Sequence, residues 1–548
     1  MLCPGSRSGP LATAAGLLAE RSALELITAV DERSAAFLAL GLATGSGRAV
    51  AVVTTSGTAV ANLLPAVVEA DRSTQPLLLL TADRPLRLKN RGANQTVNQE
   101  EFLRPACRWV VAPGPDGLHL VPEAELATCA SDAWRRAHGP TAGPVQLNLA
   151  FEEPLHTTRA EQRELQGMAL EPFVHLQQPL RLLGSAEPTP CLDPDQPGVV
   201  IAGPWRGLQG ERTIYQQALR QWLQRCGWPL LADPLALLPA DCPGRVHYWE
   251  LQLERVSPLS GLQVLRLGPL PASRRLERWL QAVDGPQLLV SEGEQRSLDP
   301  LGMAQQWNGG LAAWLQAQAE AASGEQQGLP FDDAAVAAVL DQQLPLQGAV
   351  TEPGLARHLA GLLPAGLPLM LAASSPVRDW LIWSGAAGAD RPCFSFRGAS
   401  GIDGTLSLAM GLSLVQGRMV LVTGDLALLH DSNGWLHAGP IKPPLLVVLI
   451  DNNGGGIFQQ LPIESPSSAG FERLFAMPQV VDPLALAAAH GVPGRPVAAL
   501  DDLPAALEWG LAQPGPALLH CRTDRQADAH LRTTLRVAAQ NAGPRLRN

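Results

Sequence analysis

Short apolar runs alternate with helix-like segments through the first part of the chain. The runs are rich in Val, Ile and Leu, and the segments between them carry small residues at helical spacing. Buried parallel strands joined by helices produce this alternation. The predicted strands lie at 25–30, 49–56, 76–83 and 143–151, and the predicted helices at 32–45 and 57–70. The pattern predicts a doubly wound parallel sheet in a first domain, residues 1–157.

The same alternation returns twice further along the chain. A second αβ segment lies within 158–330, with apolar runs at 199–205, 262–280 and 286–294. A third occupies 331–548, with predicted strands at 367–374, 391–396, 418–425, 445–453 and 516–522. Two stretches without a period, 157–198 and 320–330, are predicted to be linkers. We therefore expect an α/β protein with three domains, of which the first and third are alike.

Composition narrows the class of protein. The 548 residues include 46% hydrophobic and 17% charged residues, which is typical of a globular protein with a large core. A net charge of -10 argues against a nucleic-acid partner. The eight cysteines form no CxxC pair, no apolar run reaches the ~20 residues that a membrane span needs, and the first residues do not read as a signal peptide. We expect a cytoplasmic protein whose partners are small molecules or other copies of itself.

Polar residues follow two of the predicted strands in the third segment. Gly424-Asp425 ends one run and Asp451-Asn452-Asn453 ends another, with Asp425 and Asn452 separated by 27 positions. Because ligands bind at the carboxyl ends of parallel strands, both side chains are expected in one crevice. Carboxylate, amide and backbone carbonyl oxygens suit Mg²⁺, and the run of glycines lets the Gly454 carbonyl approach. The alternative is that these residues cap helices and form turns.

This spacing resembles the thiamine-diphosphate signature, although Leu426 stands where the wider superfamily has a third glycine. With Leu426, the chain resembles one branch, the 2-succinyl-5-enolpyruvyl-6-hydroxy-3-cyclohexene-1-carboxylate synthases. The stretches that carry the resemblance are 3–12, 31–43, 55–70, 79–85, 92–95, 397–407 and 451–462, with a looser match at 266–280. The resemblance implies three doubly wound parallel-sheet domains. It also implies a first helix and strand before residue 3. We expect the sequence as given to lack them, either because its start was assigned too late or because the chain tolerates an uncovered sheet edge or core.

The resemblance further implies thiamine diphosphate and Mg²⁺, or Mn²⁺ in its place, as cofactors. Glu32 matches the catalytic acid that lies beside the aminopyrimidine ring. On its own, however, Glu32 also reads as a first-turn residue of a helix capped by Asp31. The metal ligands implied are Asp425, Asn452 and Gly454. The implied cofactor contacts are Thr55, Ser56, Gly57, Gly401, Ile402, Gly424, Asp425, Leu426, Asn452, Gly454 and Ile457, with Ile402 under the bent cofactor.

The implied substrates are 2-oxoglutarate and isochorismate, both dicarboxylates, in menaquinone or phylloquinone biosynthesis. Arginine suits them because its planar fork pairs with a carboxylate through two hydrogen bonds. The implied substrate residues are Ser6, Arg7, Arg84, Asn94, Gln95, Arg274, Ser374, Arg378, Arg397, Phe458 and Leu461. Arg275 fits almost as well as Arg274. By the same resemblance, Glu32 and the metal site come from different subunits, so a homodimer or a dimer of dimers is expected.

Three other functions remain open at this point. Another thiamine-diphosphate-dependent decarboxylase or carboligase would share Glu32, Asp425 and Asn452, but would have less need of several arginines. A nucleotide-dependent oxidoreductase would need GxGxxG after a strand, and the glycines at 203–210 have the wrong spacing. A non-enzymatic relative would lack catalytic residues that are present here.

Overall fold

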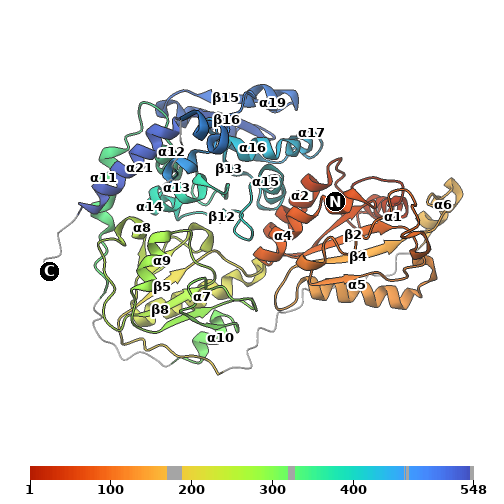
Figure 1. Cartoon of the computed structure of the whole chain (residues 1–548), viewed down its shortest axis with the longest axis horizontal. Coiled ribbons are helices and arrows are strands. Elements are labelled where there is room, and N and C mark those ends of the chain that lie inside the picture. The colour runs from red at the N-terminus through yellow and green to blue at the C-terminus, as the bar shows by residue number, and fades with distance from the viewer. Residues whose placement is uncertain (169–187, 319–327, 462, 464–467, 543–548) are drawn as a thin grey trace. The chain divides into compact units, whose positions relative to one another are not determined.

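The computed structural model describes residues 1–168, 188–318, 328–461, 463 and 468–542. Three parallel sheets account for its strands, and one sheet lies in each of the three predicted segments (Figure 1). Every strand pair within them is parallel. The expectation of an α/β protein with three parallel sheets is confirmed.

The first sheet has the strand order β1-β2-β4-β3. Its strands are β1 (Val50–Thr54), β2 (Leu77–Asp83), β3 (Trp109–Val111) and β4 (Pro144–Ala150). The accompanying helices are α1 (Gly9–Glu20), α2 (Glu32–Ser46), α3 (Thr58–Ala61), α4 (Leu64–Ser73), α5 (Glu123–Ala137) and α6 (Arg159–Gly167). At the start of the chain, Leu2 forms single bridges to Val53 and Thr28, and the Met1 ammonium donates to the Ala51 carbonyl at 2.7 Å.

Three sequence predictions for this region need correction. The predicted strand at 25–30 is reduced to the bridge at Thr28, because Leu2 alone pairs with it. The predicted helix at 57–70 is two helices, since Pro65 lacks an N–H and begins a new helix near its own position. Within the predicted linker, Arg159–Gly167 is a helix whose capping box joins Thr158 and Glu161. Residues 169–187 of that linker and 320–327 of the next lie outside the described residues.

The middle sheet has the order β10-β9-β8-β5-β6-β7. Its strands are β5 (Gly198–Ala202), β6 (Leu230–Ala232), β7 (Arg245–Val246), β8 (Gln263–Leu267), β9 (Gln287–Val290) and β10 (Gln305–Trp307). The helices include α7 (Arg212–Cys226), α8 (Trp249–Gln252), α9 (Arg274–Gln281) and α10 (Leu311–Gln316). Two apolar clusters fill its two faces, one of them built around Trp222, Trp228 and Trp314.

The third sheet has the order β12-β11-β13-β14-β16-β15. Its strands are β11 (Leu369–Leu371), β12 (Cys393–Phe394), β13 (Met419–Gly424), β14 (Leu445–Asp451), β15 (Gly494–Val497) and β16 (Ala517–Arg522). Its helices include α11 (Asp333–Gln343), α12 (Glu352–Leu362), α13 (Ser375–Trp383), α15 (Thr405–Gln416), α16 (Asp425–His430), α19 (Pro483–Ala489), α20 (Leu503–Leu511) and α21 (Arg525–Gln540). All five strands predicted in this segment are confirmed, whereas β15 was not predicted.

The chain divides into two compact units that differ from the three segments. The first contains residues 1–168 together with 396–417 and 430–443, and the second contains the remaining described residues. In the first unit, α2 packs against α15 with glycines at the contact. A Cβ on Gly41 would lie 2.2 Å from the Leu408 carbonyl oxygen, and one on Gly411 would lie 2.1 Å from that of Leu38. The two helices approach this closely because neither glycine carries a side chain.

Two further observations concern the cysteines and the possibility of a membrane-spanning helix. All eight cysteines are free, so the chain has no disulfide framework. Within the described ranges, no helix is long and apolar enough to cross a membrane.

Candidate functional site

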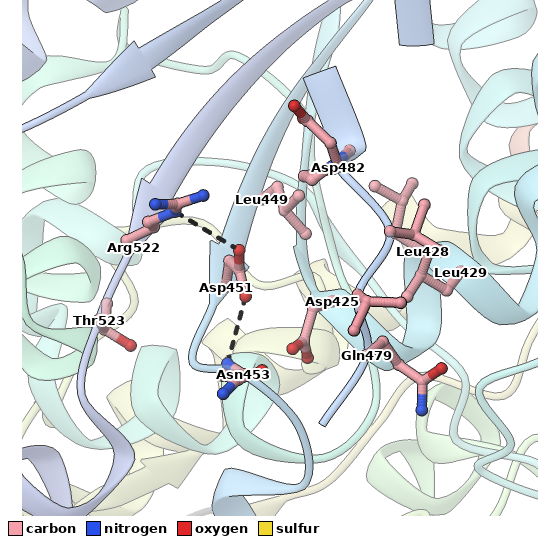
Figure 2. Close-up of a pocket in the computed structure, with 13 residues that line it drawn as sticks. Asp425, Leu428, Leu429, Leu449, Asp451, Asn453, Gln479, Asp482, Arg522 and Thr523 are labelled. Atoms are coloured by element: carbon pink, nitrogen blue, oxygen red, sulfur yellow. Dashed lines mark hydrogen bonds and ion pairs between the residues drawn. The ribbon is translucent and has the colours of Figure 1, made fainter. Parts of the chain in front are cut away.

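The third sheet carries a pocket at the carboxyl ends of its central strands. β13 and β14 are neighbours, with Gly424 opposite Ile450, so Asp425 and Asp451 leave the sheet side by side. Both line a cavity of about 410 Å³ that Asn453 and Thr523 also border (Figure 2). This is the crevice in which parallel α/β sheets bind ligands.

Asp425 is fixed by two backbone N–H groups. Its Oδ1 accepts from Leu426 at 2.8 Å and its Oδ2 from Gly454 at 2.6 Å. The side chain is buried, and burial raises the pKa of this carboxyl to about 6, with the charges of Asp451 and Glu352 acting in the same direction. A bound cation would favour the ionised carboxylate by simple charge attraction. Asp451 is different, because a hydrogen bond from His520 lowers its pKa.

Asn452 presents an unused oxygen in a buried position. Its Nδ2 donates to Glu352 Oε1 at 2.7 Å, whereas its Oδ1 has no hydrogen-bond partner among the residues that the structure describes. A buried amide oxygen without a partner is costly unless a ligand satisfies it. An amide oxygen and a carboxylate on neighbouring strand ends suit a hard cation such as Mg²⁺. In the described part of the chain, no three His, Cys, Asp or Glu side chains gather as a metal site.

Gly454 occupies a position that a side chain would block. Its φ is +123°, and a Cβ there would lie 2.1 Å from the Ala476 carbonyl oxygen. Its N–H donates to the Asp425 carboxylate, and its carbonyl accepts a hydrogen bond from the Gly456 N–H at 2.9 Å. A carbonyl has a second lone pair, so this oxygen can still reach a cation.

A buried ion cluster lies behind Asn452, and the sequence analysis missed it. Arg532 of α21 donates to Glu352 Oε2 at 2.7 Å and to both oxygens of Asp379 at 2.9 and 2.5 Å. The three side chains are 1–5% exposed. The two carboxylates raise the pKa of Arg532 despite its burial, while burial raises the pKa of Glu352. Glu352 and Asn452 are 100 positions apart, and no motif links them.

The remaining predicted residues of this unit lie near α13 and after β14. Ser374 precedes α13 with a φ of +74°, and its carbonyl accepts from Arg378 Nη1 at 2.6 Å, so the structure brings these two together. Ile457 and Phe458 lie on a 3₁₀ turn, Gly456–Gln460, and Leu461 beyond it is exposed.

Arg274 and Arg275 are distinguished by their contacts. Arg275 is held by Glu250 at 3.2 Å and Glu254 at 2.8 Å. Arg274, the first residue of α9, is exposed. Of the two, Arg274 is therefore the side chain that is open to a ligand.

In the first unit, Glu32 opens α2 as the sequence predicts. Asp31 is the N-cap and accepts the N–H groups of Arg33 and Ser34. The Glu32 carboxylate is partly exposed, and the Asn62 amide approaches it at 3.5 Å. The helix-start interpretation is thus correct for this pair, and it leaves the Glu32 carboxylate accessible for chemistry.

The loops after β1 and β2 are joined by Arg84. Its guanidinium donates to the hydroxyl of Ser56 and, at 3.0 Å, to the carbonyl of Gln95. The Gln95 amide in turn donates to the Ser56 carbonyl at 2.9 Å. Gly57 has a φ of +85°, and Thr55 faces Gly5 in the N-terminal turn. Asn94 and Ser6 are exposed.

The charges of two arginines of this unit influence one another. Arg7 is buried and binds the Phe151 carbonyl at 2.8 Å and Glu153 at 3.2 Å. Burial, and after it the charge of Arg7, lowers the pKa of Arg84. A ligand carboxylate would be attracted to such guanidinium groups.

Glu69 is a second residue that the sequence analysis missed. Its buried carboxylate accepts three backbone N–H groups, from Gly398 at 2.7 Å, Ala399 at 2.6 Å and Ser400 at 3.2 Å. These residues join Arg397 to Gly401 and Ile402, three of the predicted site residues. Glu69 thus anchors the loop in which they lie.

Comparison with known proteins gives matches along most of the chain. Residues 2–102 match the family model "Thiamine pyrophosphate enzyme, N-terminal TPP binding domain", and residues 389–521 the corresponding "C-terminal TPP binding domain". Residues 194–371 match the "Middle domain of thiamine pyrophosphate". Thiamine pyrophosphate is another name for thiamine diphosphate.

Similar proteins cover the whole chain. A 2-succinyl-5-enolpyruvyl-6-hydroxy-3-cyclohexene-1-carboxylate synthase of Parasynechococcus marenigrum is 67% identical over 100% of this chain and 99% of its own length. A synthase of the same name from Synechococcus sp. (strain CC9902) is 62% identical over 99% of this chain and 98% of its own length. One from Prochlorococcus marinus (strain MIT 9313) is 58% identical, with coverage of 98% and 96%.

Proposed function

Because the chain belongs to the 2-succinyl-5-enolpyruvyl-6-hydroxy-3-cyclohexene-1-carboxylate synthase family of thiamine-diphosphate-dependent enzymes, we propose that it catalyses the reaction of that name. In this reaction, 2-oxoglutarate loses CO₂ and its remaining four carbons add in 1,4 fashion to isochorismate, in menaquinone or phylloquinone biosynthesis. The observation that carries the proposal is the similarity to synthases of this name over the full length of both chains.

The crevice of the third sheet would hold the metal and the diphosphate. Asp425, the free oxygen of Asn452 and the Gly454 carbonyl would bind Mg²⁺ or Mn²⁺, since these are the oxygen donors that such cations prefer. The orphaned, buried Oδ1 of Asn452 supports this assignment. Gly424, Leu426 and Ile457 would contact the cofactor nearby.

The first unit would supply the acid and the cofactor's ring contacts. When bound, thiamine diphosphate supplies a nucleophilic carbon that can attack a 2-oxo acid. Glu32 would hold a proton at the cofactor's aminopyrimidine nitrogen, which its accessible carboxylate permits. Thr55, Ser56, Gly57, Gly401 and Ile402 would position the rings.

The substrates would be bound mainly by cations. Arg7 and Arg84 would take one carboxylate. Arg274, Arg378 and Arg397 would take others, because guanidinium pairs with carboxylate in a bidentate geometry. The polar groups of Ser6, Asn94, Gln95 and Ser374 would orient the substrates, and Phe458 and Leu461 would form the apolar wall.

The same proposal includes the domain boundaries, the location and the oligomeric state of the protein. The domain boundaries are 1–157, 158–330 and 331–548, and the protein is cytoplasmic. It forms a homodimer or a dimer of dimers with active sites at the interface.

The test is direct. The purified protein is incubated with 2-oxoglutarate, isochorismate, thiamine diphosphate and Mg²⁺, and the product is identified by mass spectrometry. The adduct of the four-carbon unit and isochorismate is expected. Pyruvate is offered in place of 2-oxoglutarate as the control. Turnover of pyruvate without turnover of 2-oxoglutarate would instead identify a different carboligase of the same superfamily.

A further inference from the structure

The amide of Asn452 has one correct orientation for metal binding. A cation needs the Oδ1 atom, because the NH₂ group has no lone pair to offer. The two ends of an amide have nearly the same shape, so packing alone selects between them weakly. A hydrogen-bond partner that accepts but cannot donate selects strongly.

Glu352 is such a partner. Its Oε1 accepts from Asn452 Nδ2 at 2.7 Å, and its Oε2 accepts from Arg532 at 2.7 Å. Arg532 carries only donors, so the carboxylate paired with it acts as an acceptor, and the end of the Asn452 amide that faces it must be the donor, Nδ2. The amide is therefore held with Nδ2 toward Glu352 and Oδ1 away from it.

Glu352 is itself held in place by Arg532 and Asp528. Arg532 is shared with Asp379, which also accepts from Trp383 Nε1 at 3.0 Å. The backbone N–H of Glu352 donates to Asp528 Oδ1 at 3.0 Å. All of these residues are buried. Side chains fixed in this way keep their rotamers, so the orientation that they impose on Asn452 is rigid.

We propose that Glu352, locked by Arg532, is a positioning residue that sets the amide of Asn452 for cation binding. The inference rests on the proposed metal site and adds to it the residue that orients one of its ligands. Glu352 touches neither cation nor substrate, and it acts through Asn452. Loss of such an outer hydrogen bond typically weakens metal affinity by 10–100-fold.

Glu352→Gln gives the sharpest test, since the side chains have nearly the same shape. Arg532 can only donate, so it would attract the carbonyl oxygen of the introduced glutamine and turn the new NH₂ group toward Asn452. Asn452 would then accept through Oδ1 and present Nδ2 to the cation. We expect the affinity for Mn²⁺, measured by electron paramagnetic resonance with thiamine diphosphate and without substrate, to fall by about 10–100-fold.

A double variant provides a rescue. Glu352→Gln with Asn452→Asp exchanges the amide and the carboxylate between the two positions. The introduced aspartate would accept from the NH₂ group of the introduced glutamine and still offer an oxygen to the cation. We expect Mn²⁺ affinity to return to within a few-fold of that of the parent protein. Simple loss of packing at Glu352 predicts no such recovery.

Asp299→Asn is the matched control. Asp299 forms a buried pair with Arg266 in the middle sheet, with side chains 4% and 1% exposed. This variant also neutralises a buried carboxylate beside an arginine, but it touches no candidate ligand. Its Mn²⁺ affinity is expected to match that of the parent protein, even if its melting temperature falls.

The outcomes separate this inference from the proposed function. Unchanged Mn²⁺ affinity in Glu352→Gln, together with strong loss in Asp425→Asn, would overturn the positioning role and leave the metal site standing. Unchanged affinity in Asp425→Asn would overturn the metal site itself. Failure of the double variant to recover affinity would also count against the amide orientation as the cause.

Discussion

The two acids of the candidate site are held in opposite ways. Glu32, at the start of α2, is partly exposed and has one contact at 3.5 Å. Asp425, at the start of α16, is 8% exposed and accepts two backbone N–H groups at 2.8 and 2.6 Å. A group that exchanges a proton with a cofactor needs a carboxylate that the cofactor can reach. A group that binds a metal needs a fixed one, and the difference fits the two proposed roles.

The basic residues differ in the same way. In the first unit, Arg7 pairs with the exposed Glu153, and its charge adds to the burial that lowers the pKa of Arg84. In the second unit, Arg532 is already paired with two carboxylates and holds other residues in place. In the proposal, Arg7 and Arg84 are therefore available to substrate carboxylates, whereas Arg532 acts only by holding Glu352 and Asp379 in place.

The largest expected effect comes from the loosely held acid. Glu32→Gln keeps the size and the helix start but removes the carboxylate, and general acid–base catalysis contributes about 10²–10⁴-fold. We expect kcat to fall by that factor, while thiamine diphosphate binding, followed by tryptophan fluorescence, and the melting temperature stay nearly unchanged. A kcat within a few-fold of the parent value would reduce Glu32 to a first-turn residue.

The second effect comes from the fixed acid. Asp425→Asn keeps an oxygen but removes the charge, so we expect Mg²⁺-dependent cofactor binding to weaken by at least about 100-fold. Titration calorimetry with Mg²⁺ and thiamine diphosphate measures it. Asp501→Asn, an exposed residue of the same unit, is the control. Equal losses in both variants would remove the distinction between the two acids.

A third and smaller effect concerns the loop that Glu69 anchors. Glu69→Gln replaces one acceptor oxygen with an NH₂ group, so at least one of three N–H groups loses its partner, at about 1–3 kcal/mol. We expect a lower melting temperature and a severalfold higher KM for the dicarboxylate substrates, with kcat less affected. Glu101→Gln, which breaks an exposed pair with Arg104, should change neither. A KM equal to that of the parent protein would show that the loop does not depend on Glu69.

The smallest expected effect is a pH-dependent change in folding stability. Burial raises the pKa of Asp431 to about 6, and its Oδ2 accepts the Ser407 N–H at 2.7 Å. A carboxyl with a raised folded-state pKa favours folding below its unfolded pKa, near 3.8, and this contribution is lost as the pH rises through about 6.

Asp431→Asn should remove that dependence, because the amide is neutral and its oxygen can still accept. We expect the variant to be the more stable protein at pH 7.5, by at most about 3 kcal/mol, and the difference to vanish near pH 4. Melting temperatures across this range measure it. If the two melting temperatures differ by the same amount at every pH, the effect comes from packing and not from ionisation.

The sequence predicted those features that depend on local pattern. Strand periodicity and the polar residues after β13 and β14 were enough to bring Asp425 next to Gly454. It could not predict Glu352 or Glu69, because their contacts lie 100 and 329 or more positions away and follow from tertiary packing. The strand predicted at 25–30 failed for a similar reason, since strand formation needs a partner, and here that partner is one residue, Leu2.

The position of Arg532 has a consequence for how the protein is made. A ribosome synthesises Asp425 and Asn452 well before α21, yet the guanidinium that locks Glu352 comes from that last described helix. The proposed cation site is therefore expected to form late in synthesis, and nascent chains that lack α21 are expected to bind the cofactor weakly. A premature stop codon after residue 525 would spare every residue that lines the pocket and still yield a protein with weak cofactor binding.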